Sequence, residues 1–150
     1  MRVRGLKGSS KAYLISAIVQ DMADTAFLII AQSQEEMEKL AHDLSAFRGD
    51  DDVVLFPQWQ TFLHGGASPS REVLADRMLT LERFIHGHRS IAITCVRALM
   101  HRILPPEAFR EATLRFAKGE EMDLNRAAEK LVHSGYQRVD MVEMKGDFAI

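Results

Sequence analysis

The sequence lacks the features that mark several special classes of protein. Its single cysteine, Cys95, excludes an internal disulfide. Glycine and proline are scarce, at 9 and 4 residues, which excludes a collagen-like or low-complexity chain. The longest apolar run, 26–31, is far shorter than the roughly 20 residues of a membrane span. The first residues also lack the apolar segment of a signal peptide. These absences predict a cytoplasmic protein without membrane attachment.

What is present is the composition of an ordinary globular protein. The chain has 150 residues, of which 47% are hydrophobic and 27% charged, and its net charge is −2. Residues 1–20 carry four basic side chains and no acid, and residues 71–110 carry seven arginines against four acids. Residues 120–150 reverse this balance, with seven acids against four basic residues. This distribution indicates either solvated helix faces or a basic surface for an anionic partner.

Strand and helix patterns alternate along most of the chain. Apolar runs at 26–31, 53–56 and 90–94 and the alternating stretch 113–117 predict strands. Helical spacing predicts helices over 10–22, 33–47, 73–86 and 96–103, the first capped by Ser9 or Ser10 and the second by Ser33. We therefore expect an α/β fold with a mostly parallel sheet flanked by helices, and the strand at 26–31 buried on both faces. The expected buried strand residues are Phe27, Leu28, Ile29, Ile30, Val54, Leu55, Ile91 and Ile93.

The last thirty residues have a different pattern. Asp123 is placed to cap a helix that ends at Gly135. A strand over 136–142, a turn at 145–146 and a second strand from 147 predict a hairpin. We expect an α/β domain over 1–118 and the beginning of a small α+β domain over 119–150. Since the chain stops inside the second strand, this domain is expected to be incomplete and the chain to be a fragment.

The segment from Gly5 to Ala12 has partial similarity to a phosphate-binding P-loop, which reads G-x-x-x-x-G-K-[ST]. Gly5 and Lys11 stand at the required positions, with Gly8 between them. Ser10 replaces the second glycine, and Ala12 replaces the hydroxyl residue that holds Mg²⁺. We therefore interpret 5–12 either as a P-loop that has lost its chemistry or as a turn before a capped helix. Neither interpretation requires a cofactor.

Other chemically active residue types have simpler interpretations. The pair His86 and His88 favours a helix C-cap over a metal site, because no cysteine or carboxylate stands beside it at ligand spacing. Cys95 follows an apolar run and is typical of core packing. Trp59 either packs over the end of the sheet or lines a crevice there. The run His64-Gly-Gly66 has no accompanying nucleophile motif. We predict no catalytic and no metal-binding residues.

Several segments, taken in order, resemble one protein family. They are Gly5 to Lys11, Ser33-Gln-Glu, Leu55-Phe-Pro-x-Trp59-x-Thr61, Ser68-Pro69, Arg77-Met-Leu-Thr-Leu81, Ala98-Leu-Met-x-Arg102 with Pro105-Pro106, Gly135-Tyr-x-Arg-Val-Asp140 and Gly146-x-Phe148-Ala149. Together they resemble the N-terminal, UvrB-like region of the bacterial transcription-repair coupling factor (Mfd) family. The chain departs from the family at 63–70, so no role is carried over onto that loop.

The resemblance implies a function in DNA repair. It implies an α/β unit with a degenerate P-loop, and a small domain that captures the excision-repair protein UvrA. The family's ATP-dependent DNA translocase motor lies elsewhere in the longer protein, so this chain is expected to be non-catalytic. Other domains of the parent chain are further expected partners, whereas RNA polymerase and DNA are expected only through the parent protein. The predicted UvrA contact is Arg138, with Asp140, Glu143 and Phe148 beside it.

Three alternatives remain open at this stage. Arg138 and Asp140 lie on one face of the predicted strand and are placed to pair with each other instead of with a partner. The chain is also open to interpretation as a nucleotide hydrolase or helicase-type domain with an atypical P-loop. Finally, the same surface would serve a lid that masks another domain of the parent chain.

Overall fold

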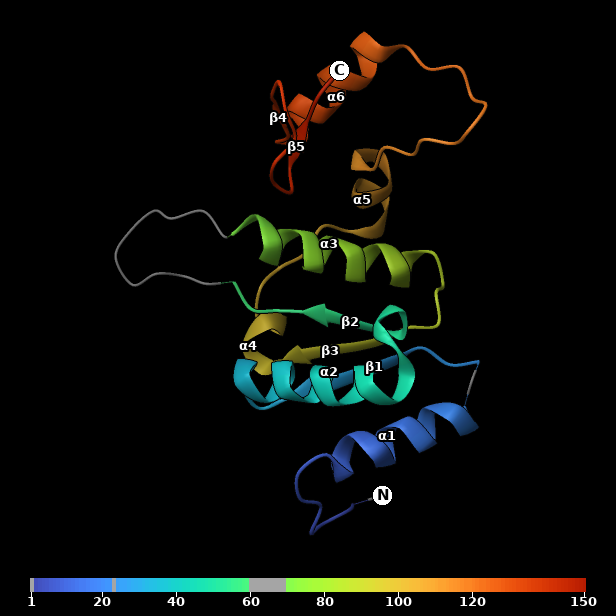
Figure 1. Cartoon of the computed structure of the whole chain (residues 1–150), viewed down its shortest axis with the longest axis vertical. Coiled ribbons are helices and arrows are strands. Elements are labelled where there is room, and N and C mark those ends of the chain that lie inside the picture. The colour runs from blue at the N-terminus through green and yellow to red at the C-terminus, as the bar shows by residue number, and fades with distance from the viewer. Residues whose placement is uncertain (1, 23, 60–69) are drawn as a thin grey trace, which may run out of the picture. The chain divides into compact units, whose positions relative to one another are not determined.

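The computed structural model describes residues 2–22, 24–59 and 70–150 (Figure 1). The chain divides into two compact units, Met1–Arg102 and Ile103–Ile150, and each is described by itself. The expected domains 1–118 and 119–150 remain a prediction. No helix among the described residues combines the length and apolar content that crossing a membrane requires.

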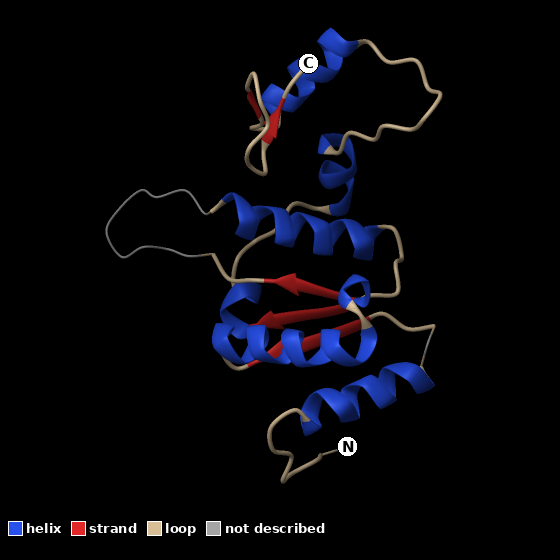
Figure 2. Ribbon diagram, in the orientation of Figure 1, coloured by secondary structure: helices blue, strands red, loops and turns tan. Residues whose placement is uncertain are grey.

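The first unit is a three-stranded parallel sheet flanked by helices, which confirms the predicted α/β class (Figure 2). The strand order is β1-β3-β2, and β3 pairs in parallel with both neighbours. In chain order its elements are α1 (Ser10–Asp21), β1 (Phe27–Ala31), α2 (Gln34–Arg48), the 3₁₀ turn η1 (Asp50–Asp52), β2 (Val53–Phe56), α3 (Arg71–Ile85), β3 (Ile91–Cys95) and α4 (Val96–Leu99).

Local side-chain chemistry sets the ends of these helices. The Ser33 hydroxyl accepts from the Glu36 N–H at 3.1 Å and caps α2 as predicted. Ser70 caps α3 in the same way, accepting from the Val73 N–H at 3.3 Å. Ser9 occupies the N-cap of α1 without a side-chain cap bond, whereas the Ser10 hydroxyl donates to the Lys7 carbonyl at 2.6 Å. The predicted N-cap position of Ser9 is therefore confirmed, although neither serine caps α1 through its hydroxyl group.

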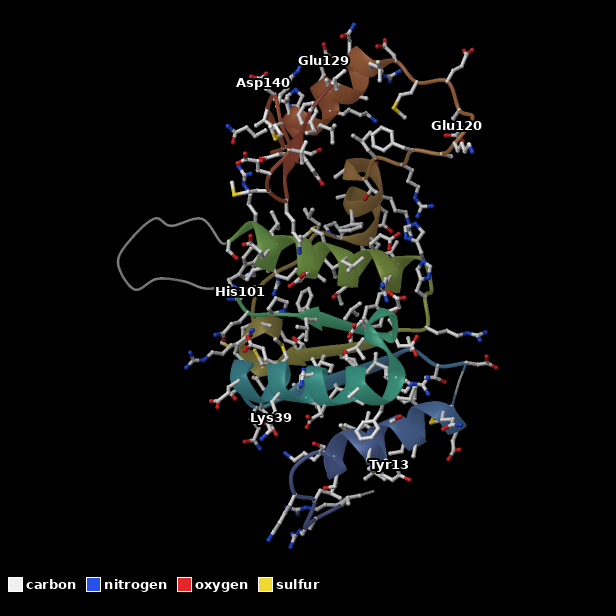
Figure 3. All side chains as sticks on the ribbon, in the orientation of Figure 1. Tyr13, Lys39, His101, Glu120, Glu129 and Asp140 are labelled. Atoms are coloured by element: carbon white, nitrogen blue, oxygen red, sulfur yellow. The ribbon has the colours of Figure 1, made fainter. Side chains whose placement is uncertain are left out.

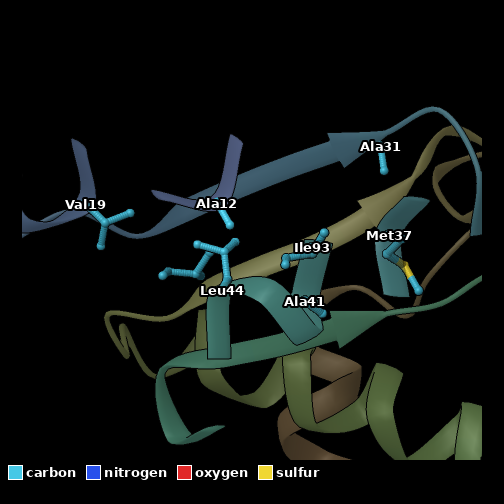
Figure 4. Close-up of a cluster of buried hydrophobic side chains, with 8 residues drawn as sticks. Ala12, Val19, Ala31, Met37, Ala41, Leu44 and Ile93 are labelled. Atoms are coloured by element: carbon cyan, nitrogen blue, oxygen red, sulfur yellow. The ribbon is translucent and has the colours of Figure 1, made fainter. Parts of the chain in front are cut away.

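The main core lies between the sheet and helices α1 and α2 (Figure 4). Its fully buried members come from both helices and from strands β1 and β3: Ala12, Val19, Ala31, Met37, Ala41, Leu44, Ile91 and Ile93. Helix α3 packs against β2, where the Thr80 hydroxyl donates to the Leu55 carbonyl at 2.7 Å. The central strand β3 is buried along its whole length, because both faces and both edges are covered.

The prediction that β1 is buried on both faces is wrong. Leu28 and Ile30 are each 53% exposed, whereas Ile91 and Ile93 of β3 are buried. The strand order explains the difference, since β1 is an edge strand in the described sheet and α3 packs against β2. Val54 is buried as predicted, and Phe27, Ile29 and Leu55 are partly buried against the main core.

The second unit contains α5 (Pro106–Ala112), α6 (Leu124–His133), β4 (Gln137–Arg138) and β5 (Asp147–Phe148). The predicted helix 96–103 ends early, at Leu99, and α5 begins at Pro106. A proline is tolerated in the first turn because the backbone N–H that proline lacks would have no helical partner there. The strand predicted at 113–117 does not form. Alternating side chains without a neighbouring strand cannot make the ladder hydrogen bonds that define a strand.

The predicted hairpin at the end of the chain is also wrong, because β4 and β5 are parallel. The Gln137 N–H donates to the Gly146 carbonyl at 2.8 Å, and the Val139 N–H donates to the Phe148 carbonyl at 2.9 Å. The segment between the strands folds back before β5 begins, and the Asp147 carboxylate accepts from the Met144 N–H at 3.2 Å. The helix before them is as predicted, with Asp123 accepting two backbone N–H groups at 2.9 and 3.2 Å.

Candidate functional site

The P-loop-like segment contains two glycines with positive φ. Gly5 and Gly8 have positive φ, 83° and 54°, a conformation that glycine adopts most easily. The Lys7 carbonyl then accepts both the backbone N–H and the hydroxyl of Ser10, at 3.2 and 2.6 Å. A donor that a phosphate loop would offer to its ligand is therefore used within the loop.

Lys11 is held by a carboxylate of the protein itself. Its Nζ donates to Glu36 Oε1 at 2.7 Å, and Glu36 Oε2 accepts from the Gln32 N–H at 3.1 Å. The hydrogen bond from Lys11, followed by that from Gln32, lowers the pKa of the Glu36 carboxyl. Glu36 thus supplies the negative charge that a phosphate would supply in a working P-loop, and it joins the start of α1 to the first turn of α2.

Ala12 is fully buried in the main core. It has no oxygen for a metal ion, and an apolar methyl group suits its position. Among the described ranges, no group of three or more histidine, cysteine or acidic residues is placed to hold a metal. A cavity of about 190 Å³ opens beside Val19, at the opposite end of α1 from this loop. Within the described residues, the Lys11–Glu36 contact connects the start of α1 to the first turn of α2.

A buried arginine organises the chain after β2. Arg77 is 1% exposed, and its guanidinium lies 3.8 Å from the ring centroid of Phe56 and 4.7 Å from that of Trp59. Its Nη1 donates to the Pro57 carbonyl at 2.7 Å, while Nη2 has no partner within the described part of the chain. Burial lowers the pKa of Arg77. The sequence offered one signal for this residue, an arginine within the apolar stripe of a helix.

The contact of the Trp59 ring with the buried Arg77 guanidinium favours packing over ligand binding for Trp59. Its ring also meets that of His101 edge-on, at 6.5 Å between centroids (Figure 3 labels His101). The neighbouring loop residues of the sequence argument, Thr61, His64-Gly-Gly66 and Ser68-Pro69, lie outside the described residues.

The remaining candidates have structural roles. Cys95 is 1% exposed, and its Sγ lies 3.9 Å from Gln34 Oε1 and 4.0 Å from Gln58 Oε1. His86 follows α3 as its C-cap, with Nδ1 2.9 Å from the Glu82 carbonyl. Both agree with the simpler interpretation of the sequence.

The predicted partner residues of the second unit lie around β4. Arg138, Asp140 and Glu143 are exposed, whereas Phe148 is only 8% exposed. β4 ends at Arg138 and the chain bends at Asp140, so the two residues do not share a strand as predicted. The structure records no ion pair between their side chains, both of which are described. Arg138 therefore presents its guanidinium to solvent, and Phe148 is the residue paired with it on the neighbouring strand β5.

An apolar segment flanks Arg138. Met141, Val142 and Met144 are 72%, 54% and 58% exposed, and Tyr136 is 44% exposed. Exposed methionine and tyrosine side chains around an arginine are typical of protein interfaces. The second unit therefore exposes apolar side chains close to Arg138 in the sequence.

A comparison with known protein families matches part of the second unit. Residues 114–150 match the family described as "UvrB interaction domain". The match begins after α5 and contains α6, β4, β5 and all four predicted partner residues.

The whole chain is similar to transcription-repair-coupling factors. It is 28% identical to that of Bacillus subtilis over 146 residues, which are 97% of this chain and 12% of the relative. It is 27% identical to that of Escherichia coli over 144 residues, or 96% of this chain and 12% of the relative. The Mycobacterium bovis protein is 30% identical over 130 residues, or 82% and 10%. The family resemblance predicted from the sequence is confirmed, and the chain spans about a tenth of its relatives' length.

Proposed function

We propose that this chain is a non-catalytic recognition module of a transcription-repair coupling factor, and that its second unit binds UvrA to recruit excision repair. The observation that supports this most directly is the match of residues 114–150 to the UvrB interaction domain, within a chain that is similar to coupling factors along its length. The module would act in the cytoplasm, and its other partners would be further domains of the parent protein.

The chemistry of the second unit supports a protein partner. Arg138 presents planar donors that match a carboxylate, and arginine is enriched among binding hot spots. Asp140 and Glu143 are exposed polar groups that set the charge pattern around it. Phe148 would act indirectly, because it is only 8% exposed and is paired with Arg138 on the neighbouring strand.

Titration of UvrA against the full chain tests this proposal. We expect Arg138→Ala to weaken binding roughly thirtyfold or more, since a desolvated arginine–carboxylate contact contributes about 2–5 kcal/mol. The matched control is Arg110→Ala, an exposed arginine of α5 outside the matched residues, which should bind as the unaltered chain does. Thermal melts of both variants check the fold. Unchanged affinity of Arg138→Ala removes this residue from the site, and no binding by the unaltered chain overturns the proposal.

The absence of catalysis needs a separate test. We expect no Mg²⁺-dependent ATP turnover by the chain, nor by the double variant Ser10→Gly/Ala12→Ser that restores the P-loop pattern. Glu36 still holds Lys11 in that variant, and a hydroxyl at the buried position 12 costs about 1–3 kcal/mol of stability. The measurement is phosphate release against a no-protein blank. Release that disappears on Lys11→Ala would establish the nucleotide-hydrolase alternative.

A further inference from the structure

The β4–β5 loop, residues 139–146, is closed at its base by hydrogen bonds (Figure 1 labels both strands). The Gln137 N–H donates to the Gly146 carbonyl at 2.8 Å, which joins the two ends of the loop. The turn before β5 is fixed twice: the Asp147 N–H donates to the Met144 carbonyl at 3.1 Å, and the Asp147 carboxylate accepts from the Met144 N–H at 3.2 Å. Surface loops whose ends are joined in this way are frequently functional.

The β4–β5 loop exposes several apolar side chains on one short segment. All six residues at 140–145 are exposed. Met141, Val142 and Met144 are each more than half exposed. Single exposed apolar residues are normal, whereas several that gather together mark sites of interaction with other proteins. Methionine suits such a site, because its unbranched thioether adapts to an irregular partner surface.

The same loop lies among the residues proposed to contact UvrA. It begins directly after Arg138, ends two residues before Phe148, and contains Asp140 and Glu143 (Figure 3 labels Asp140). The loop also lies within residues 114–150, which match the UvrB interaction domain. Its apolar side chains are therefore continuous in the chain with the proposed UvrA surface, and UvrA is the occupant to which we assign them.

We infer that Met141 and Met144 are apolar contacts for UvrA and a site of reversible oxidation by peroxide that weakens binding. This inference rests on the proposed function. In the reaction, the thioether sulfur attacks one oxygen of hydrogen peroxide, an S–O bond forms, the O–O bond breaks and the other oxygen leaves as water. Sulfur is oxidised and peroxide is reduced. The sulfoxide is polar, so it would place an oxygen without a partner in an apolar contact.

Burial separates these two side chains from the methionine of the core. Met37 is 0% exposed in the main core, so peroxide does not reach its sulfur while the first unit is folded. Met22 and Met100 are exposed in the first unit, outside the matched residues. We expect them to be oxidised without any effect on UvrA binding. Oxidation therefore changes the surface of the chain and leaves its core intact.

Peroxide treatment of the full chain, ended with catalase before UvrA is added, tests the inference. Mass spectrometry should find one added oxygen on each of Met141 and Met144 and none on Met37. The affinity for UvrA should fall roughly tenfold or more, because a buried polar group without a partner weakens an interaction by about this factor. Treatment with methionine sulfoxide reductases for both sulfoxide epimers should restore the affinity.

Two pairs of substitutions assign the effect to the β4–β5 loop. Met141→Leu/Met144→Leu removes both thioethers, so the affinity of this variant for UvrA should be the same before and after peroxide. The matched control Met22→Leu/Met100→Leu should lose affinity on treatment as the unaltered chain does. Thermal melts before and after treatment check that every chain remains folded.

Three results would overturn the inference. They are unchanged affinity of the oxidised chain, an equal effect of peroxide on Met141→Leu/Met144→Leu, and a dimer mass in light scattering that halves on oxidation. The last result would assign the loop to a second copy of the chain. The proposed function is judged by the untreated chain: if that chain binds UvrA and the oxidised chain binds equally well, only the inference about oxidation fails. If the untreated chain does not bind UvrA, the proposed function fails.

Discussion

At the scale of single residues, the contact between Lys11 and Glu36 engages the lysine of the P-loop-like segment. A lysine that would otherwise meet a phosphate is held at 2.7 Å by a carboxylate of the next helix. The same carboxylate accepts the Gln32 N–H, so it also stabilises the start of α2. One acidic side chain therefore connects two elements.

The Glu36 carboxyl predicts a pH dependence of stability. Its pKa is lowered in the folded protein, so the contact stabilises the fold above the unfolded-state pKa of about 4.3. This contribution is lost as the pH falls through the lowered pKa. The free energy of unfolding in urea, measured between pH 7 and pH 2, should therefore fall less on acidification in Glu36→Gln than in the unaltered chain. Glu35→Gln, in the same helical turn, is the control. Its free energy of unfolding should fall at low pH as much as that of the unaltered chain. Identical pH profiles for Glu36→Gln and the unaltered chain would contradict the role of this contact.

At the scale of elements, the position of a strand in the sheet decides how much each apolar side chain contributes to the free energy of unfolding. The sequences of β1 and β3 are similarly apolar, and both were expected in the interior. β3 lies between two strands, whereas β1 has one neighbour in the described sheet. Strand order is a long-range property, and the local pattern of either strand does not contain it.

Two alanine substitutions test this difference. Ile93→Ala should lower the free energy of unfolding by about 3 kcal/mol, because Ile93 is 0% exposed and a cavity would remain. Ile30→Ala should cost below about 1 kcal/mol, since that side chain is already 53% exposed. Urea denaturation followed by circular dichroism measures both. Equal losses would mean that another surface covers β1 in solution, which a dependence on protein concentration would reveal.

At the scale of the whole molecule, the chain consists of two compact units with different compositions. Both hydrophobic clusters of buried side chains lie within residues 1–102. The second unit has 48 residues, carries the predicted UvrA contacts and exposes much of its apolar surface. A small unit with few buried side chains is expected to gain stability from a partner.

The two units predict an outcome for truncation. Residues 1–102 should unfold in one cooperative transition, because they contain both clusters and the complete described sheet. They should also lose UvrA binding, since the predicted contacts are absent. Urea denaturation of the truncated chains 1–102 and 1–118 compares the unit boundary after Arg102 with the boundary after residue 118 that the sequence predicts. If the truncated chain 1–102 is unfolded and the chain 1–118 is folded, the boundary lies at residue 118.

The sequence by itself determined the features that depend on near neighbours. The caps Ser33 and Asp123, the parallel α/β class and the departures from the P-loop pattern at positions 10 and 12 all follow from patterns of a few residues. Such signals are readable because capping and helical spacing act over one or two turns. The family resemblance was also readable, since it rests on ordered short segments.

Only the tertiary structure decided the features that depend on distant pairing. The exposure of Leu28 and Ile30 required the strand order, and the parallel pairing of β4 with β5 required the path between them. The contacts Lys11–Glu36 and Arg77–Trp59 join residues separated by 25 and 18 positions. No local pattern specifies such contacts, because their free energy depends on which surfaces the folded chain brings together.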